Sequence, residues 1–425
     1  MSSTSAPDPA TPKPKPALPL GDLIRVFGRI GLLSFGGPAA QISLMHRELV
    51  EIRDWLSETQ FLSALSFAML LPGPEAMQLA TYAGWKQRGT LGGVIAGGLF
   101  VLPGAVVILT LALCYIHFGD LAPIHAVFRG VQAAVVVIVI LALRNIAARA
   151  LTGPGAYGLA ALAFVALSSL HLPFPLVIIA AALWGAFTAA APDTPARPAL
   201  PRFPFRPVMA CLALWAAPLI WLAMTGQDFL LDLALFFSKL AVVTFGGAYA
   251  VLAYMTQAVV SDHGWLSLPQ MIDALGLAET TPGPLILVTQ FVGTLAGHGQ
   301  GGITMALAAA GLTLWVTFIP CFLWIFAGAP YVDHLTHQPR LRGALQAITA
   351  AVTGVILNLS LWFALHVLFD RVDQTRFGPL PDWGSFDSTA AGLMLGAGLL
   401  MIGLKRGMLM TLLLCALAGG LTGSF

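Results

Sequence analysis

The sequence predicts an all-α polytopic membrane protein made of two inverted repeats of about six helices, joined by an extra helix and broken at Phe-Gly-Gly and Pro-Gly-Pro motifs. Hydrophobic residues make up 58% of the chain and charged residues 9%, whereas about a quarter of a soluble domain is charged. Residues 21–74 also return as residues 231–284 without a gap, and 19 of the aligned positions are identical. Helices are expected throughout because they satisfy every backbone group inside a bilayer.

Four regions follow one another along the chain. Residues 1–20 are rich in Pro, Ser and Thr and lack an apolar core with a cleavage site, so we expect a disordered cytoplasmic tail and not a signal peptide. Residues 21–190 form the first repeat, 191–227 a basic Pro-rich linker plus a connecting helix, and 228–425 the second repeat. Thirteen apolar segments of spanning length lie near 22–46, 61–84, 91–116, 126–148, 155–171, 174–190, 208–225, 229–256, 270–297, 302–328, 341–368, 388–404 and 407–424.

The distribution of Lys and Arg predicts the orientation of these segments. With the N-terminus in the cytoplasm, fourteen basic residues fall at cytoplasmic ends and four at external ends, as the positive-inside rule requires. Six segments, one connecting segment and six further segments then place the second repeat upside down relative to the first. Inverted repeats are typical of transporters with alternating access. We therefore expect a multi-pass protein of the cell inner (plasma) membrane with a cytoplasmic N-terminus.

Two motifs rich in glycine and proline interrupt the helices at matching positions of both repeats. They are the Phe-Gly-Gly motifs with the hydroxyl residue before each, and the Pro-Gly-Pro motifs: Ser34, Phe35, Gly36 and Gly37; Thr244, Phe245, Gly246 and Gly247; Pro72, Gly73 and Pro74; Pro282, Gly283 and Pro284. Two prolines in three residues prevent a continuous helix, and the second suits the first turn of a new helix. Free N–H groups at such a start attract anions. The alternative is that the glycines permit close packing and the prolines shape the bundle.

One basic residue lies six positions before each Phe-Gly-Gly motif, Arg29 in the first repeat and Lys239 in the second. A cation inside a bilayer is costly and indicates function, so we expect this pair to bind an anionic substrate. Asp22 and Asp232 lie seven positions earlier, about two helical turns away on the same face. The structural alternative is that each cation pairs with its own aspartate or reaches the membrane interface.

Further polar residues near the breaks complete the predicted site. Gln78 and Gln290 follow the Pro-Gly-Pro motifs and are candidates to hydrogen-bond the substrate. Glu75 either favours a helix start or carries a proton; Asp273 and Glu279, which have no acidic counterpart in the first repeat, suit proton coupling or line a cavity. The cysteines and histidines have no metal-ligand spacing and no Walker motif is present. The sequence therefore predicts no enzyme, no metal, no cofactor and no nucleic-acid partner.

The combination of these motifs resembles the chromate ion transporter family in its two-domain, long-chain form. The segments that carry the resemblance are SFGGPAAQI with LLPGPEAMQLATYAGW, and TFGGAYAVLAYM with TPGPLILVTQFVG. The resemblance implies chromate efflux, the outward movement of a divalent tetrahedral oxyanion, with membrane potential or a proton gradient as the expected driving force. A carrier of sulfate or another oxyanion, working as an exporter or as an importer, and an anion channel stay open as alternatives. The expected partners are a small oxyanion, chromate or sulfate, and the lipid bilayer, and a homodimer is an alternative to a monomer.

Overall fold

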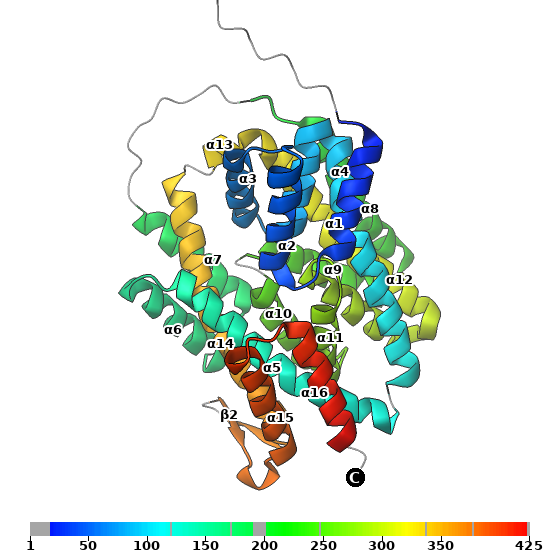
Figure 1. Cartoon of the computed structure of the whole chain (residues 1–425), viewed down its shortest axis with the longest axis vertical. Helices are drawn as coiled ribbons and strands as arrows, with labels where there is room; N and C mark the ends of the chain where they lie inside the picture. Colours follow the sequence, from blue (N-terminus) through cyan, green and yellow to red (C-terminus); the bar gives the residue numbers. More distant parts are fainter. Residues whose placement is uncertain are drawn as a thin grey trace, which may run out of the picture.

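The structure is a computed structural model that describes residues 18–119, 121–170, 172–189, 201–245, 248–335, 338–375 and 378–422. Nearly all of these residues are helical (Figure 1). Within the described ranges the strands form one two-stranded antiparallel sheet, β1 (Val372–Thr375) and β2 (Gly378–Pro381), which precedes the last helices. The expected all-α membrane fold is confirmed.

The helices follow the two sequence repeats in order. The first half contains α1 (Leu20–Leu33), α2 (Gly37–His46), a π-helical turn η1 (Arg47–Ile52), α3 (Glu58–Leu70), α4 (Glu75–Phe118), α5 (Ala122–Ala150), α6 (Pro154–Ser168) and α7 (Phe174–Thr188). The connecting helix is α8 (Phe205–Thr225). The second half contains α9 (Asp228–Val243), α10 (Ala248–Gln257), a π-helical turn η2 (Ala258–Asp262), α11 (Leu268–Thr280), a 3₁₀ turn η3 (Leu285–Leu287), α12 (Val288–Gly328), α13 (Val332–Leu335), α14 (Pro339–Leu368), α15 (Ser388–Gly398) and α16 (Met408–Thr422).

Five helical runs of the described chain are long and apolar enough to cross a membrane. They are Glu75–Phe118, Ala122–Ala150, Phe205–Thr225, Leu285–Tyr331 and Pro339–Leu368. The other apolar segments expected to span form shorter helices, many of 10 to 17 residues. Thirteen spans were expected because hydropathy measures only the apolar composition of a segment. A broken or half-length helix in lipid is as apolar as a helix that spans the membrane.

The Phe-Gly-Gly break folds the chain back on itself in each half. In the first half, Arg29 of α1 forms an ion pair with Glu48, beyond α2, with Nη1 and Oε1 3.6 Å apart. In the second half, Phe236 of α9 contacts Trp265, beyond η2, with ring centroids 5.6 Å apart. A straight helix would place Arg29 and Glu48 roughly 28 Å apart. The two helices around each break therefore form a hairpin and not a kinked span (Figure 1).

A second hairpin lies inside each of the two longest helical runs. The backbone leaves helical geometry at residues 88–89 of α4 and at residues 301–302 of α12. The arms of α4 pack so closely that a Cβ atom on Gly84 would lie 2.3 Å from the carbonyl oxygen of Gly92. Each run is thus a short arm that follows a Pro-Gly-Pro motif and a long arm that turns back along it.

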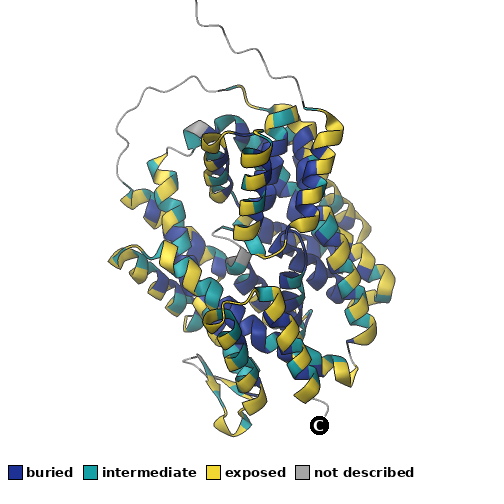
Figure 2. Ribbon diagram, viewed as in Figure 1, coloured by how far each residue is buried: buried dark blue, intermediate teal, exposed yellow. Residues whose placement is uncertain are grey.

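The two halves interlock. α5 of the first half packs against α14, α15 and α16 of the second, and α4 packs against α12. Buried residues gather in the interior of the bundle, while many outward-facing side chains are exposed and apolar (Figure 2). A broad apolar outer surface suits a lipid environment, and the interlocked packing brings the breaks of the two halves together.

Candidate functional site

The helix breaks meet in crossed pairs. The amide of Gly73 donates to the carbonyl of Thr244, and the amide of Gly283 donates to the carbonyl of Ser34, each with a nitrogen–oxygen distance of 2.9 Å. Each Pro-Gly-Pro motif is thus bonded to the residue that precedes Phe-Gly-Gly in the other half. The structure therefore brings motifs that are far apart in the sequence into direct contact.

Gly73 shows why these motifs need glycine. Its φ of 122° is rarely adopted by residues with a side chain. A Cβ atom would also lie 2.8 Å from Nε2 of Gln78 and 2.9 Å from Sγ of Cys321, which belongs to α12 of the other half. Gly104 of α4 likewise lies so close to Pro282 that a Cβ atom on Gly104 would clash with the Pro282 carbonyl oxygen. Both Pro-Gly-Pro motifs are held against a helix of the opposite half.

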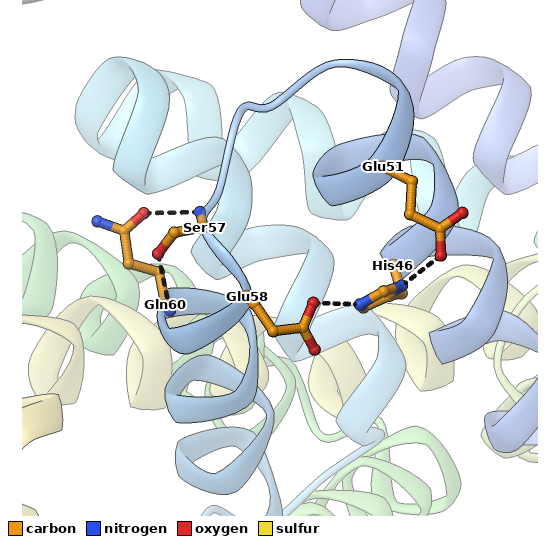
Figure 3. A network of polar contacts seen from close by, with 5 residues as sticks. All are labelled: His46, Glu51, Ser57, Glu58 and Gln60. Carbon is orange, nitrogen blue, oxygen red and sulfur yellow. Dashed lines mark hydrogen bonds and ion pairs between the residues drawn. The ribbon is translucent and has the colours of Figure 1, made fainter.

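The surface ends of the hairpins are fixed by polar contacts. His46, at the end of α2, pairs through Nε2 with Oε2 of Glu58 at 2.7 Å and through Nδ1 with Oε1 of Glu51 at 3.1 Å (Figure 3). α3 then begins with a capping box (Figure 3). The backbone N–H of Gln60 donates to Ser57 Oγ, and the backbone N–H of Ser57 donates to the side-chain Oε1 of Gln60. α11 begins with the same box in the second half.

The helix starts at the breaks have no such cap. Within the described part of the chain, no side-chain cap is formed at the first turn of α2, which begins at Gly37, or of α4, which begins at Glu75. The first amides of a helix have no partner within the helix, and they carry a partial positive charge. Most other helices of the described chain, such as α5, α6 and α14, also begin without a side-chain cap. It is therefore the position of these two starts at the breaks, and not the missing cap alone, that suits an anionic substrate.

The polar side chains at the breaks differ in how well they are satisfied. Ser34 and Thr244 are buried, and their hydroxyls donate to carbonyls one turn earlier in their own helices. Gln78 donates from Nε2 to the carbonyl of Pro72 at 2.7 Å. The Oε1 atoms of Gln78 and Gln290 are buried without a hydrogen-bond partner. These two amides are the predicted site residues with unused hydrogen-bonding capacity.

Gln41 is a site residue that the sequence reasoning missed. Its Nε2 donates to the carbonyl of Gly283 at 2.7 Å and to the carbonyl of Ser34 at 3.2 Å, so it joins both members of one crossed pair. Its counterpart in the second half is Val251. The sequence reasoning considered polar residues before the Phe-Gly-Gly motifs or around the Pro-Gly-Pro motifs and passed over it, although a buried glutamine in an apolar segment is itself a signal.

The remaining motif residues lie at the breaks with different exposure. Phe35 and Gly36 are exposed and Phe245 is half-buried. Gly246 and Gly247 lie outside the described residues. Glu75 is half-buried at the first position of α4, where a carboxylate is favoured by the helix start. The residues of the second Pro-Gly-Pro motif, Pro282, Gly283 and Pro284, are buried, whereas Pro74 of the first is half-buried.

Arg29 pairs with a carboxylate that the sequence analysis did not consider. Glu48 is 3% exposed and contacts both Arg29, at 3.6 Å, and Arg53. The expected alternative partner, Asp22, forms no ion pair with Arg29 within the described residues. The Arg29 side chain remains 59% exposed, so Glu48 partly neutralises it but leaves it accessible.

Lys239 has different surroundings from Arg29. It lines a cavity of about 370 Å³ together with Asp232, Tyr254, Ala258, Asp262 and His263, among others. Its Nζ lies 5.6 Å from the centre of the Tyr254 ring, and within the described ranges it forms no ion pair. Ala258 occupies the position that Glu48 has in the first half, so among the described residues Lys239 has no ion pair like that of Arg29, although Asp232 and Asp262 line the same cavity. The structure places each cation within its own half.

Asp273 and Glu279, which have no acidic counterpart in the first half, are buried and hydrogen-bonded. Asp273 accepts from the Tyr115 hydroxyl and from Nε2 of Gln132, each at 2.8 Å, and both donors belong to the first half. Glu279 accepts from the Tyr249 hydroxyl at 2.7 Å. Among the described residues, no group of three or more His, Cys, Asp or Glu side chains could hold a metal ion.

Comparison with known proteins decides the family. A family model described as chromate transporter matches residues 21–186 and 231–420. The chain belongs to the chromate transporter family. The resemblance inferred from the motifs is confirmed, and the family is one of transporters and not of enzymes.

Three relatives named as chromate transport proteins match over most of their length. The chromate transport protein of Cupriavidus metallidurans is 30% identical over 356 residues, which are 84% of this chain and 85% of that protein. A chromate transport protein of Pseudomonas aeruginosa is 31% identical over 385 residues, 88% of each chain. A probable chromate transport protein of Synechococcus elongatus is 32% identical over 362 residues, 80% of this chain and 84% of the relative. No solved structure matches.

Proposed function

We propose that this protein exports chromate from the cytoplasm across the inner membrane and binds the dianion where the helix breaks meet. The crossed pairs formed by Gly73 with Thr244 and by Gly283 with Ser34 are the main support. They bring uncapped helix starts of both halves together, and such starts favour anions. Chromate is proposed as the substrate because the relatives from Cupriavidus metallidurans and Pseudomonas aeruginosa are named chromate transport proteins.

The membrane potential favours export because the substrate carries two negative charges. Moving one charge through 100 mV is worth about 2.3 kcal/mol, so a dianion that leaves a negative interior gains about 4.6 kcal/mol per 100 mV. Membrane potential alone therefore suffices for efflux, and a proton gradient adds to or opposes it according to the coupling.

Sulfate has the same shape and charge as chromate and is the competing substrate.

Alternating access follows in this proposal from inverted repeats. Helix hairpins at equivalent positions of both halves, with crossed bonds between them, support a pseudo-two-fold relation, and the distribution of basic residues favours an axis in the membrane plane. Rocking one half against the other would break and remake the crossed pairs around a fixed anion. Arg29 and Lys239 would then attract the anion on the way into and out of the site.

Cellular chromate content tests the function. Cells that express the protein should accumulate several-fold less chromate than cells that carry an empty vector, and should grow at higher chromate concentrations. Equal accumulation, with the protein shown to be in the membrane, would exclude export. Increased accumulation would indicate an importer.

The orientation is tested by labelling at the two ends of the chain. The start of α1 and the end of α16 lie at opposite ends of the molecule (Figure 1), and the basic residues favour a cytoplasmic N-terminus. Cysteines placed at Ser3 and Ser424, in a chain without its four native cysteines, should react oppositely with an impermeant thiol reagent in intact cells: position 424 labelled, position 3 protected. Labelling of both or neither would contradict the inverted arrangement.

The unpaired state of Lys239 is tested by giving it the carboxylate that Arg29 has. Ala258→Glu should place an acid in the cavity beside Lys239, as Glu48 lies beside Arg29. We expect transport to fall at least five-fold at equal expression, because the added charge opposes the anion. Ala258→Gln, of nearly the same size but uncharged, should retain most of the transport. Equal losses in both variants would assign the effect to packing.

A further inference from the structure

A carboxyl–phenol pair joins α10 to α11 next to the two helix breaks of the second half. Glu279 lies on α11, three residues before Pro282, and Tyr249 lies on α10, two residues after the Phe-Gly-Gly motif. The Tyr249 hydroxyl donates to Oε1 of Glu279 at 2.7 Å. Glu279 is in the last turn of α11, which ends at Thr280 just before the Pro-Gly-Pro motif, so it is near the break where we place the anion.

The Glu279–Tyr249 pair has no counterpart in the first half. The aligned positions of the first half are Met69 for Glu279 and Ala39 for Tyr249. Met69 is 53% exposed, whereas Glu279 is 5% exposed. The first half therefore forms its hairpins without any equivalent bond, and the second half has added a buried acid that the fold does not need.

Glu279 has no cation to neutralise it. In the described ranges no Lys, Arg or His forms an ion pair with it, and its second oxygen, Oε2, has no hydrogen-bond donor. Tyr249 is the titratable side chain that contacts it. The other acid of α11, Asp273, differs because each of its oxygens accepts a hydrogen bond, one from Tyr115 and one from Gln132. A carboxylate inside a membrane without a cation is costly, so Glu279 is suited to bind and release a proton.

We propose, on the basis of the proposed function, that Glu279 carries one proton along with each oxyanion in the same direction. A bound dianion repels an ionised carboxylate, so binding of the anion favours proton uptake from the water on that side. When the anion leaves on the other side, the repulsion ends and the proton passes to the water there. The net charge moved per cycle is −1, from −2 for the dianion and +1 for the proton.

The experiment measures anion and proton movement together. Purified protein is placed in proteoliposomes that contain a pH-sensitive dye, and chromate flux is driven by a clamped membrane potential at alkaline pH, where chromate is a dianion. The wild type should move about one proton per chromate. Glu279→Gln should move chromate with proton movement reduced to less than one-tenth, whereas Asp273→Asn should keep the wild-type ratio of protons to chromate.

The other outcomes decide whether this coupling, and the transport function itself, hold. If Glu279→Gln shows no net flux, exchange of labelled chromate between equal concentrations must persist, because exchange requires no net proton movement; loss of exchange as well would overturn the proposal. A wild-type ratio of protons to chromate in Glu279→Gln would overturn it directly. Chromate flux without protons in the wild type would overturn the coupling and leave the transport function standing, whereas no chromate flux at all in the wild type would remove both.

Discussion

Replacing Gly73 with alanine is expected to reduce chromate transport at least ten-fold while the protein still reaches the membrane. The φ of 122° at this position and the close approach of Gln78 and Cys321 leave no room for a Cβ atom. Strain of this kind costs about 1–3 kcal/mol, and it is relieved by moving Gly73 away from Thr244. The crossed pair would open, and the helix starts would lose their relative position. Flux in proteoliposomes, normalised to folded protein, measures the effect.

A matched glycine in the same half serves as the control. Gly28 of α1 has no atom within 4 Å of where its Cβ would lie, and alanine favours the helix by about 1 kcal/mol. Gly28→Ala should therefore transport normally and unfold at the same or a higher temperature. If Gly73→Ala transported as well as Gly28→Ala, the crossed pairs would be packing contacts without a role in transport.

Removing Lys239 should have the second large effect. Lys239→Ala is expected to lower transport at least ten-fold, equivalent to about 1.4 kcal/mol, with little change in thermal stability because the side chain is exposed and forms no ion pair among the described residues. Lys239→Arg should keep much of the activity because the charge remains. The rate at sub-saturating chromate, in vesicles of matched protein content, is the quantity to compare.

The equivalent change in the first half should be weaker. Arg29→Ala removes one of the two guanidinium groups on Glu48 but leaves Arg53 in place, so the carboxylate stays paired. We expect transport to fall several-fold, and less than in Lys239→Ala. Equal and near-normal transport in both alanine variants would show that neither cation contacts the substrate route.

The repeats made the positions of the breaks predictable, because glycine and proline act locally on the backbone. The path of the chain after each break was not predictable in the same way. Whether a broken helix continues or turns back depends on what it packs against, and the ion pair between Arg29 and Glu48 exists only because α2 returns alongside α1. Asp22, nearer in sequence and on the same helical face, was the partner named in the structural alternative to anion binding.

The site itself was predicted in outline and not in detail. The motifs marked the Pro-Gly-Pro and Phe-Gly-Gly residues, but which motif meets which is a property of the interlocked halves. Gln41 was missed because the polar residues considered lie before the Phe-Gly-Gly motifs or around the Pro-Gly-Pro motifs, whereas Gln41 follows a Phe-Gly-Gly motif. The difference between Glu48 and Ala258, which leaves Lys239 without an ion pair like that of Arg29 among the described residues, is likewise visible only once the hairpins are in place.

The most direct test of the account is chromate flux through purified protein under an imposed potential. Labelled chromate is followed in proteoliposomes with wild type, Gly73→Ala and Gly28→Ala at equal protein content. The account predicts saturable flux in the wild type that increases with potential, is competed by sulfate, persists in Gly28→Ala and falls at least ten-fold in Gly73→Ala. Wild-type flux no greater than in protein-free vesicles, or unitary currents typical of a channel, would contradict it.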